Sequence, residues 1–221
     1  MVEDKSMKIF CIGLSKTATS SLAEALEILG YKAVHWDDTR YVFRYSKEGI
    51  DIDYKKFDTY DAFADTPIAR IYRELDKKYP GSKFILTVRD VEKWIKSFED
   101  QFSEGTEDPF AKRLHMDLYG TSSYDYDKCT TAFKSHTQNA IEYFKNRQQD
   151  LLIMDITKGD GWNKLCPFLN RPIPNISFPK RYTKEERKES VAIRIGRLLK
   201  NPSSVPGKIF NRLSMAIRTK K

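Results

Sequence analysis

Short apolar runs alternate with longer amphipathic stretches along most of the chain. The clearest run is 83–88, Lys-Phe-Ile-Leu-Thr-Val, which is nearly all apolar, as expected of a strand that is buried on both faces. Similar runs at 9–12, 31–36, 61–65 and 151–154 predict four more strands.

Apolar positions at helical spacing fill the intervals between these runs. This pattern predicts helices at 20–29, 37–48, 67–79, 91–102, 126–147 and 161–169. Residues 50–60 and 103–123 are polar and weakly periodic, so they predict loops, the second around a short helix. Because strands that alternate with helices form right-handed crossovers, we predict an α/β fold in three layers around a central, mainly parallel sheet.

The bulk composition fits one α/β domain with an appendage. The chain has 221 residues, of which 40% are hydrophobic and 32% charged, so wholesale disorder is excluded. No apolar run approaches the ~18 residues of a membrane span, and the polar, acidic N-terminus differs from a secretory signal. Three widely spaced cysteines suit a reducing compartment. We therefore expect a cytoplasmic protein.

The net charge of +8 is confined to one end of the chain. Residues 183–221 contain eleven Lys and Arg and three Glu, while 28 basic and 28 acidic residues cancel elsewhere. We predict a neutral domain at 1–182, which does not suggest a nucleic-acid partner, and a basic helical extension at 183–221. Its apolar stripes could lie on an anionic membrane as a peripheral contact. Packing against the domain or a partner subunit is the open alternative.

A polar loop follows the first strand and carries the first candidate chemistry. Residues 8–22 read Lys-Ile-Phe-Cys-Ile-Gly-Leu-Ser-Lys-Thr-Ala-Thr-Ser-Ser-Leu. The free N–H groups and the dipole of the helix that follows favour an anion, and Lys16 adds a positive charge. The common nucleotide-hydrolase loop has a glycine directly before its lysine, whereas Ser15 stands here. The alternative is an ordinary turn capped by Thr19 or Ser20.

A second stretch could bind phosphate as well. Arg89 directly follows the strand at 83–88, and Ser97 lies eight residues later, about two helical turns on. A guanidinium fork and a hydroxyl could grip one phosphate from two sides. A structural Arg–Asp pair and a solvent-facing serine form the alternative.

Taken together, the two stretches resemble the sulfotransferase family that uses 3′-phosphoadenylyl sulfate (PAPS). In that family a Lys-Thr-Gly-Thr loop binds the 5′-phosphosulfate, and an arginine with a serine eight residues on binds the 3′-phosphate. Residues 16–19 match the first motif, with Ala18 where the family usually has glycine, and Arg89 and Ser97 match the second. Further similarity lies in residues 79–90 and 151–174.

The resemblance implies a fold like that of P-loop nucleotide hydrolases. It also implies in-line transfer of a sulfuryl group from PAPS to a hydroxyl or amine, with adenosine 3′,5′-bisphosphate (PAP) as product and no metal. The implied cofactor-binding residues are Ser15, Lys16, Thr17, Ala18, Thr19, Ser20, Arg89 and Ser97. Lys16 would neutralise the bridging oxygen as a catalytic residue. Asp65, followed by Thr66-Pro67, stands where family members place a base. Its alternative role is to cap the next helix.

The acceptor is the least defined part of this prediction. His35 and Asp37 follow the second strand at the same sheet edge and are candidate acceptor contacts. The rest of the acceptor site would come from residues 37–60 and 103–125, which match no acceptor-specific pattern. A small molecule, a glycan and a lipid therefore all stay open, as does a homodimer.

Two other functions remain in view. A nucleotide kinase or NTPase would use the strand end at 151–155 for magnesium, although the glycine before Lys16 is missing. A catalytically degenerate member would bind nucleotide without turnover, and Ala18 is its only support.

Overall fold

The computed structural model describes residues 7–39 and 42–181, without the side chains of residues 37 and 38. The strands are β1 (Ile9–Cys11), β2 (Ala33–Val34), β3 (Phe43–Tyr45), β4 (Ile50–Ile52), β5 (Ala62–Phe63), β6 (Lys83–Thr87) and β7 (Leu151–Met154). The α-helices are α1 (Thr19–Ile28), α2 (Trp36–Thr39), α3 (Thr66–Lys78), α4 (Val91–Phe102), α5 (Pro109–Tyr119), α6 (Tyr126–Tyr143) and α7 (Trp162–Phe168). Short 3₁₀ helices are η1 (Tyr54–Asp58), η2 (Gln148–Asp150) and η3 (Ile156–Lys158).

A five-stranded sheet of order β2-β5-β1-β6-β7 forms the centre of the domain, and all of its strand pairs are parallel. The chain leaves β1 toward one edge of the sheet and later returns to β6 on the other side of β1. The connections therefore diverge between β1 and β6, where parallel sheets open a crevice beyond their carboxyl ends. The predicted parallel sheet is confirmed.

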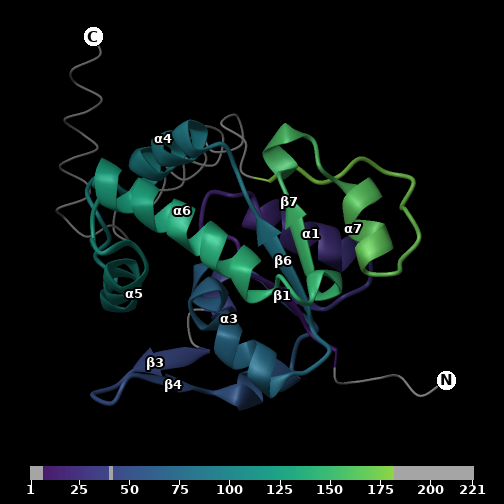
Figure 1. Ribbon diagram of the computed structural model, residues 1–221, viewed down its shortest axis with the longest axis horizontal. Helices are drawn as coiled ribbons and strands as arrows, with labels where there is room; N and C mark the ends of the chain where they lie inside the picture. Colours follow the sequence, from purple (N-terminus) through teal and green to yellow (C-terminus); the bar gives the residue numbers. More distant parts are fainter. Residues whose placement is uncertain (1–6, 40–41, 182–221) are drawn as a thin grey trace, which may run out of the picture. The chain divides into compact units, whose positions relative to one another are not determined.

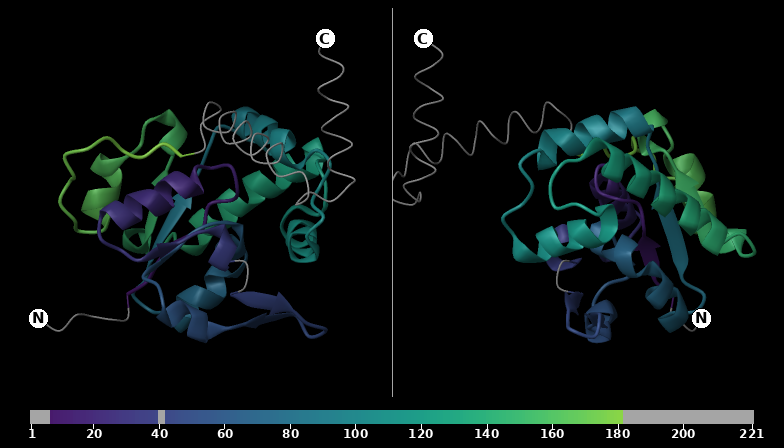
Figure 2. Two further views of the ribbon diagram at one scale, coloured as in Figure 1. Left: turned by 180° about the vertical axis from the view of Figure 1, so that it is seen from behind. Right: turned by 60° about the vertical axis from the view of Figure 1, so that its left-hand side comes forward.

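Helices cover both faces of this sheet because successive strand residues point to opposite sides. Ile9 and Cys11 pack toward α1 and α7, whereas Phe10 packs with side chains of α3 and the end of α6. Accordingly, α6 lies in front of the sheet in Figure 1, and α1 lies in front of it in the reverse view of Figure 2. The predicted three layers are therefore present.

A third group of buried side chains packs α4 to the rest of the domain. Trp94 of α4 stacks on Phe133 of α6 at a centroid distance of 4.4 Å, and Tyr119 of α5 lies 4.9 Å from Phe98. Leu14, in the loop after β1, is buried in the same cluster. The aromatic packing thus fixes α4 next to the loop that was predicted to bind an anion.

The helix predicted at 37–48 is wrong. Among the described residues of this range only α2 is helical, and an antiparallel hairpin of β3 and β4 follows, with Phe43 opposite Ile52 and Tyr45 opposite Ile50. The hairpin closes through Gly49, whose φ of +135° suits glycine, and whose carbonyl accepts a bond of 2.8 Å from Ser46 N. The loop predicted at 50–60 is consequently β4 and η1, whereas α5 is the short helix expected within 103–123.

The described domain ends in an extended segment after α7, and its compact unit closes at Pro179. The basic extension predicted at 183–221 lies outside the described residues, so its helices and its boundary stay predictions. Within 7–39 and 42–181, no helix is both long and apolar enough to cross a membrane.

Candidate functional site

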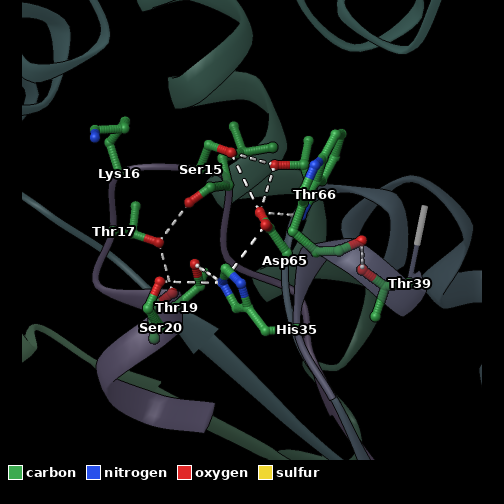
Figure 3. A network of polar contacts seen from close by, with 12 residues as sticks. Ser15, Lys16, Thr17, Thr19, Ser20, His35, Thr39, Asp65 and Thr66 are labelled. Carbon is green, nitrogen blue, oxygen red and sulfur yellow. Dashed lines mark hydrogen bonds and ion pairs between the residues drawn. The ribbon is translucent and has the colours of Figure 1, made fainter. Parts of the chain in front are cut away.

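The predicted site residues come from loops that follow four neighbouring strands. The loop after β1 holds residues 15–18, His35 follows β2, Asp65 follows β5, and Arg89 follows β6. Figure 3 shows how the first three of these loops converge. The sheet therefore brings together side chains that lie far apart in the sequence.

Gly13 allows the loop after β1 to lie against the end of β6. A Cβ atom at Gly13 would lie 1.8 Å from Oγ1 of Thr87 and 2.6 Å from the Thr87 carbonyl oxygen, so no larger residue fits. The buried Thr17 hydroxyl donates to the Leu14 carbonyl at 2.6 Å and lies 2.6 Å from the Thr87 hydroxyl. Because the single hydroxyl proton of Thr17 is donated to the Leu14 carbonyl, the Thr87 hydroxyl is the donor in its hydrogen bond with Thr17. The Thr17 side chain thus anchors the loop.

The loop presents an uncapped helix N-terminus. Ala18 precedes α1 with φ +71° and ψ +32°, and no side chain caps the helix. The first internal bond runs from Leu22 N to Ala18 O at 3.1 Å, so the amides of Thr19 and Ser20 have no acceptor within the helix. The alternative of a turn capped by Thr19 or Ser20 is therefore wrong. The left-handed conformation of Ala18 costs roughly 1–2 kcal/mol that glycine would not incur.

Three side chains from the β6–α4 segment hold this loop. Arg89 Nη1 donates to the Lys16 carbonyl at 3.0 Å, and Trp94 Nε1 donates to the Ser15 carbonyl at 2.8 Å. Gln101 accepts a bond of 2.6 Å from Lys16 Nζ. Ser97 lies between Trp94 and Gln101 on α4 and is half-buried. Both predicted phosphate-binding stretches are therefore in direct contact.

Asp65 is held in an unusual backbone conformation. Its φ of +97° and ψ of +171° belong to a region that is essentially reserved for glycine, and only 6% of the residue is exposed. Its Oδ1 atom accepts a hydrogen bond of 2.7 Å from Thr66 N and lies 3.0 Å from Thr66 Oγ1. Asp65 therefore caps α3, as the alternative interpretation proposed. Strained conformations of this kind are concentrated at active sites.

A polar network joins Asp65 to the start of α1. Nε2 of His35 lies 3.5 Å from Oδ2 of Asp65, 3.1 Å from Oγ1 of Thr19 and 3.2 Å from Oγ of Ser20. On the other side, Ser15 Oγ lies 3.3 Å from Asp65 Oδ1. In Figure 3 the Lys16 side chain points away from this network. The site therefore combines a cationic, amide-lined loop with a neighbouring carboxylate–imidazole pair.

His115 and Tyr119, which the sequence analysis did not assign, lie beside Asp65. Both are buried on α5. Burial lowers the pKa of His115 to about 4, although the Asp65 carboxylate acts in the opposite direction. Burial also raises the pKa of Tyr119, and the same carboxylate adds to that increase. Their i, i+4 spacing on one helix was the only sequence signal that could have paired them.

His136 supports the loop from the opposite side. Its Nε2 lies 2.7 Å from the Ile12 carbonyl oxygen, which can only accept, so this nitrogen carries the proton. Burial lowers the pKa of His136, although its bond to the Ile12 carbonyl acts in the opposite direction. His136 thus positions the end of β1.

The remaining candidates lie elsewhere or cannot be placed. Asp37 belongs to α2, and its side chain lies outside the described residues. The Asp155 carboxylate, the proposed magnesium ligand of the kinase alternative, caps η3 through Lys158 N at 3.1 Å and Thr157 Oγ1 at 2.6 Å. In the described part of the chain, no three His, Cys, Asp or Glu side chains gather as a metal site.

A cavity of about 740 Å³, between residues 159–164 and 173–178, includes none of the predicted site residues.

Comparison with known proteins adds two findings. A family model described as a sulfotransferase domain matches residues 8–187. Ava biosynthesis cluster protein M of Aspergillus versicolor is 27% identical over 207 residues, which cover 78% of this chain and 80% of that protein.

Proposed function

This chain is a member of the sulfotransferase family, and from that premise we propose that it transfers a sulfuryl group from PAPS to a hydroxyl or amine acceptor by in-line displacement. The observation that carries the proposal is the uncapped N-terminus of α1 between Lys16 and the carboxylate–imidazole pair. It combines anion binding with a group that can take a proton.

The donor end of the proposed site is the loop after β1. The amides of Thr19 and Ser20 and the ammonium group of Lys16 are suited to the 5′-phosphosulfate, because they combine free N–H donors with a positive charge. Ala18 already holds the left-handed conformation that a glycine would adopt there, which supports a loop shape compatible with PAPS. Ser15 and Thr17 contribute by fixing that loop.

The nucleotide end of the proposed site is Arg89 with Ser97. Arg89 already touches the loop through the Lys16 carbonyl, so one guanidinium can link both ends of the donor. A charged donor with fixed geometry suits the 3′-phosphate, which carries no reacting bond. PAPS supplies the activated sulfuryl group, and positioning together with charge stabilisation should account for most of the rate enhancement. The proposal requires no metal.

We propose a small biosynthetic molecule as the acceptor, because the name of the Aspergillus versicolor relative places that protein in a biosynthesis cluster. The hairpin and α5 are the elements proposed to surround the acceptor.

A peripheral contact of residues 183–221 with anionic membrane is a separate proposal. Deleting those residues should abolish binding to anionic vesicles at low salt, and unchanged binding would rule out the contact.

The deciding experiment is calorimetric titration of the full chain with PAP and, separately, with ATP–magnesium. The proposal predicts tight binding of PAP and weak binding of ATP–magnesium. The reverse order would favour a kinase and overturn the assignment. Release of PAP from PAPS in the presence of simple phenols, alcohols and amines then distinguishes an active enzyme from a degenerate member that only binds.

A further inference from the structure

We infer that His35 takes the proton of the acceptor and that Asp65 is the positioning residue that stabilises the resulting imidazolium. The inference rests on the proposed function and assigns a role to each member of the carboxylate–imidazole pair. It is carried by the contacts of the two carboxylate oxygens, by the exposure of the two side chains, and by the place of His35 beside α1.

One oxygen of Asp65 is already occupied by donors of this chain. Ser15 Oγ and Thr66 Oγ1 lie 2.5 Å apart, and each lies within 3.3 Å of Asp65 Oδ1. Each hydroxyl has a single proton, so one of them donates to the other and the second donates to Oδ1. Together with Thr66 N, Oδ1 therefore receives two hydrogen bonds in either arrangement. Only Oδ2 remains for another group, and it faces His35.

The two side chains differ in their access to an incoming acceptor. The Asp65 side chain is 8% exposed, whereas the His35 side chain is 30% exposed. The backbone of Asp65 is held at φ +97°, and its carboxylate points toward Thr66 and His35 in Figure 3. An acceptor that arrives from solvent therefore reaches the imidazole first, with the carboxylate behind it.

His35 also lies where the donor and the acceptor must meet. Its Nε2 is within 3.2 Å of the hydroxyls of Thr19 and Ser20, on the helical turn that is proposed to hold the phosphosulfate. When no PAPS is bound, either hydroxyl can donate a hydrogen bond to Nε2. When they turn to the phosphosulfate oxygens instead, the lone pair of Nε2 becomes available to the acceptor.

The transfer step balances with these groups. The acceptor oxygen or nitrogen forms a bond to sulfur while the bond from sulfur to the bridging 5′-phosphate oxygen breaks. The electron pair of the broken bond leaves with PAP beside Lys16, and the acceptor proton moves to Nε2 of His35. The Asp65 carboxylate, 3.5 Å away, compensates the new positive charge. Water then removes the proton from the partly exposed ring.

The test compares His35→Ala, His35→Gln and Asp65→Asn in the full chain. PAP binding is measured by calorimetry, and turnover as PAP release from PAPS with a panel of simple phenols, alcohols and amines. Both His35 variants should bind PAP within about threefold of wild type, while kcat falls by roughly 10²–10³. Asp65→Asn should lower kcat by about tenfold with little change in KM. His35→Gln keeps a polar group near Thr19 and Ser20, so it serves if His35→Ala does not fold.

Chemical rescue separates a proton acceptor from a structural histidine. Added imidazole should restore part of the turnover of His35→Ala and none of that of Asp65→Asn or Lys16→Ala. Near-normal turnover in both His35 variants, or a rate for His35→Ala that imidazole leaves unchanged, would overturn the inference. A wild-type chain that neither binds PAP nor releases it from PAPS would reject the proposed function itself, which is a different result.

Discussion

The ammonium group of Lys16 donates a hydrogen bond of 2.6 Å to Oε1 of Gln101, one turn beyond Ser97 on α4. This contact draws the lysine toward α4 and away from the polar network around Asp65 (Figure 3). We propose that Lys16 reaches a phosphosulfate group at the start of α1 by exchanging the amide oxygen of Gln101 for a charged oxygen. On this proposal, Gln101 competes with the ligand.

Replacing Gln101 with alanine should tighten the binding of PAP. An exposed hydrogen bond contributes roughly 0.5–1 kcal/mol, so its loss from the free state should lower the Kd by about two- to fivefold. Calorimetric titration of the Gln101→Ala variant measures this change. Gln138→Ala, an exposed glutamine on α6, is the matched control and should leave the Kd unchanged. A weaker Kd in Gln101→Ala would show that Gln101 orients Lys16 for the ligand rather than competing with it.

Lys16→Ala and Arg89→Ala should affect different steps. Lys16→Ala removes the charge proposed to neutralise the leaving oxygen, so kcat should fall by about 10²–10³ with a smaller loss of PAP binding. Arg89→Ala removes a charge-assisted contact to the 3′-phosphate and should weaken PAP binding by about 10–100-fold. Steady-state kinetics and calorimetry on the two variants check the difference. Near-normal turnover in Lys16→Ala would contradict the proposed role of the lysine.

Ala18→Gly should stabilise the protein. The residue lies at φ +71°, which costs a non-glycine residue roughly 1–2 kcal/mol, and the greater freedom of glycine in the unfolded chain offsets part of the gain. We expect the free energy of unfolding to rise by about 0.5–1 kcal/mol in urea titrations. Ala23→Gly, inside the same helix, is the matched control and should lower it by about 1 kcal/mol. If Ala18→Gly and Ala23→Gly lowered the free energy of unfolding equally, the left-handed backbone at Ala18 would carry no strain.

The sheet was predictable because its central strands are buried on both faces. A strand such as β6, with Phe84, Ile85 and Leu86 all buried, must be apolar throughout, so its sequence differs from an amphipathic helix. The positions of Asp65 and Arg89 then follow, since the carboxyl ends of parallel strands meet at one edge. The strand pattern therefore placed these residues at one edge of the sheet, and the family resemblance was needed to assign them to a site.

The hairpin was not predictable from local pattern. Residues 37–48 carry aromatic side chains that suit either a helix face or a strand, and the choice depends on distant partners. Phe43 lies 5.3 Å from the ring of Phe110, which belongs to α5 and is far away in the sequence. Such packing overrides local propensity. For the same reason, the sequence could not place His115 beside Asp65, because their proximity depends on how α5 docks.

The buried His115 should make the protein less stable in mild acid. Burial lowers its pKa from 6.5 to about 4, so below about pH 6.5 the unfolded chain binds a proton that the folded chain excludes. The free energy of unfolding therefore falls as the pH drops toward 4, and at pH 5 this residue lowers it by about 2 kcal/mol relative to pH 7.5. His136, whose pKa burial also lowers, acts in the same direction.

His115→Phe removes this contribution and keeps an aromatic ring against Phe102, whose centroid lies 4.7 Å from that of the imidazole. The free energy of unfolding is measured in urea at about pH 7.5 and about pH 5. Its decrease between these two pH values should be smaller by about 2 kcal/mol in the variant than in wild type. The carboxylates and His136 contribute to both proteins, so they cancel from this comparison. An unchanged difference would mean that His115 takes up its proton equally in the folded and unfolded chain.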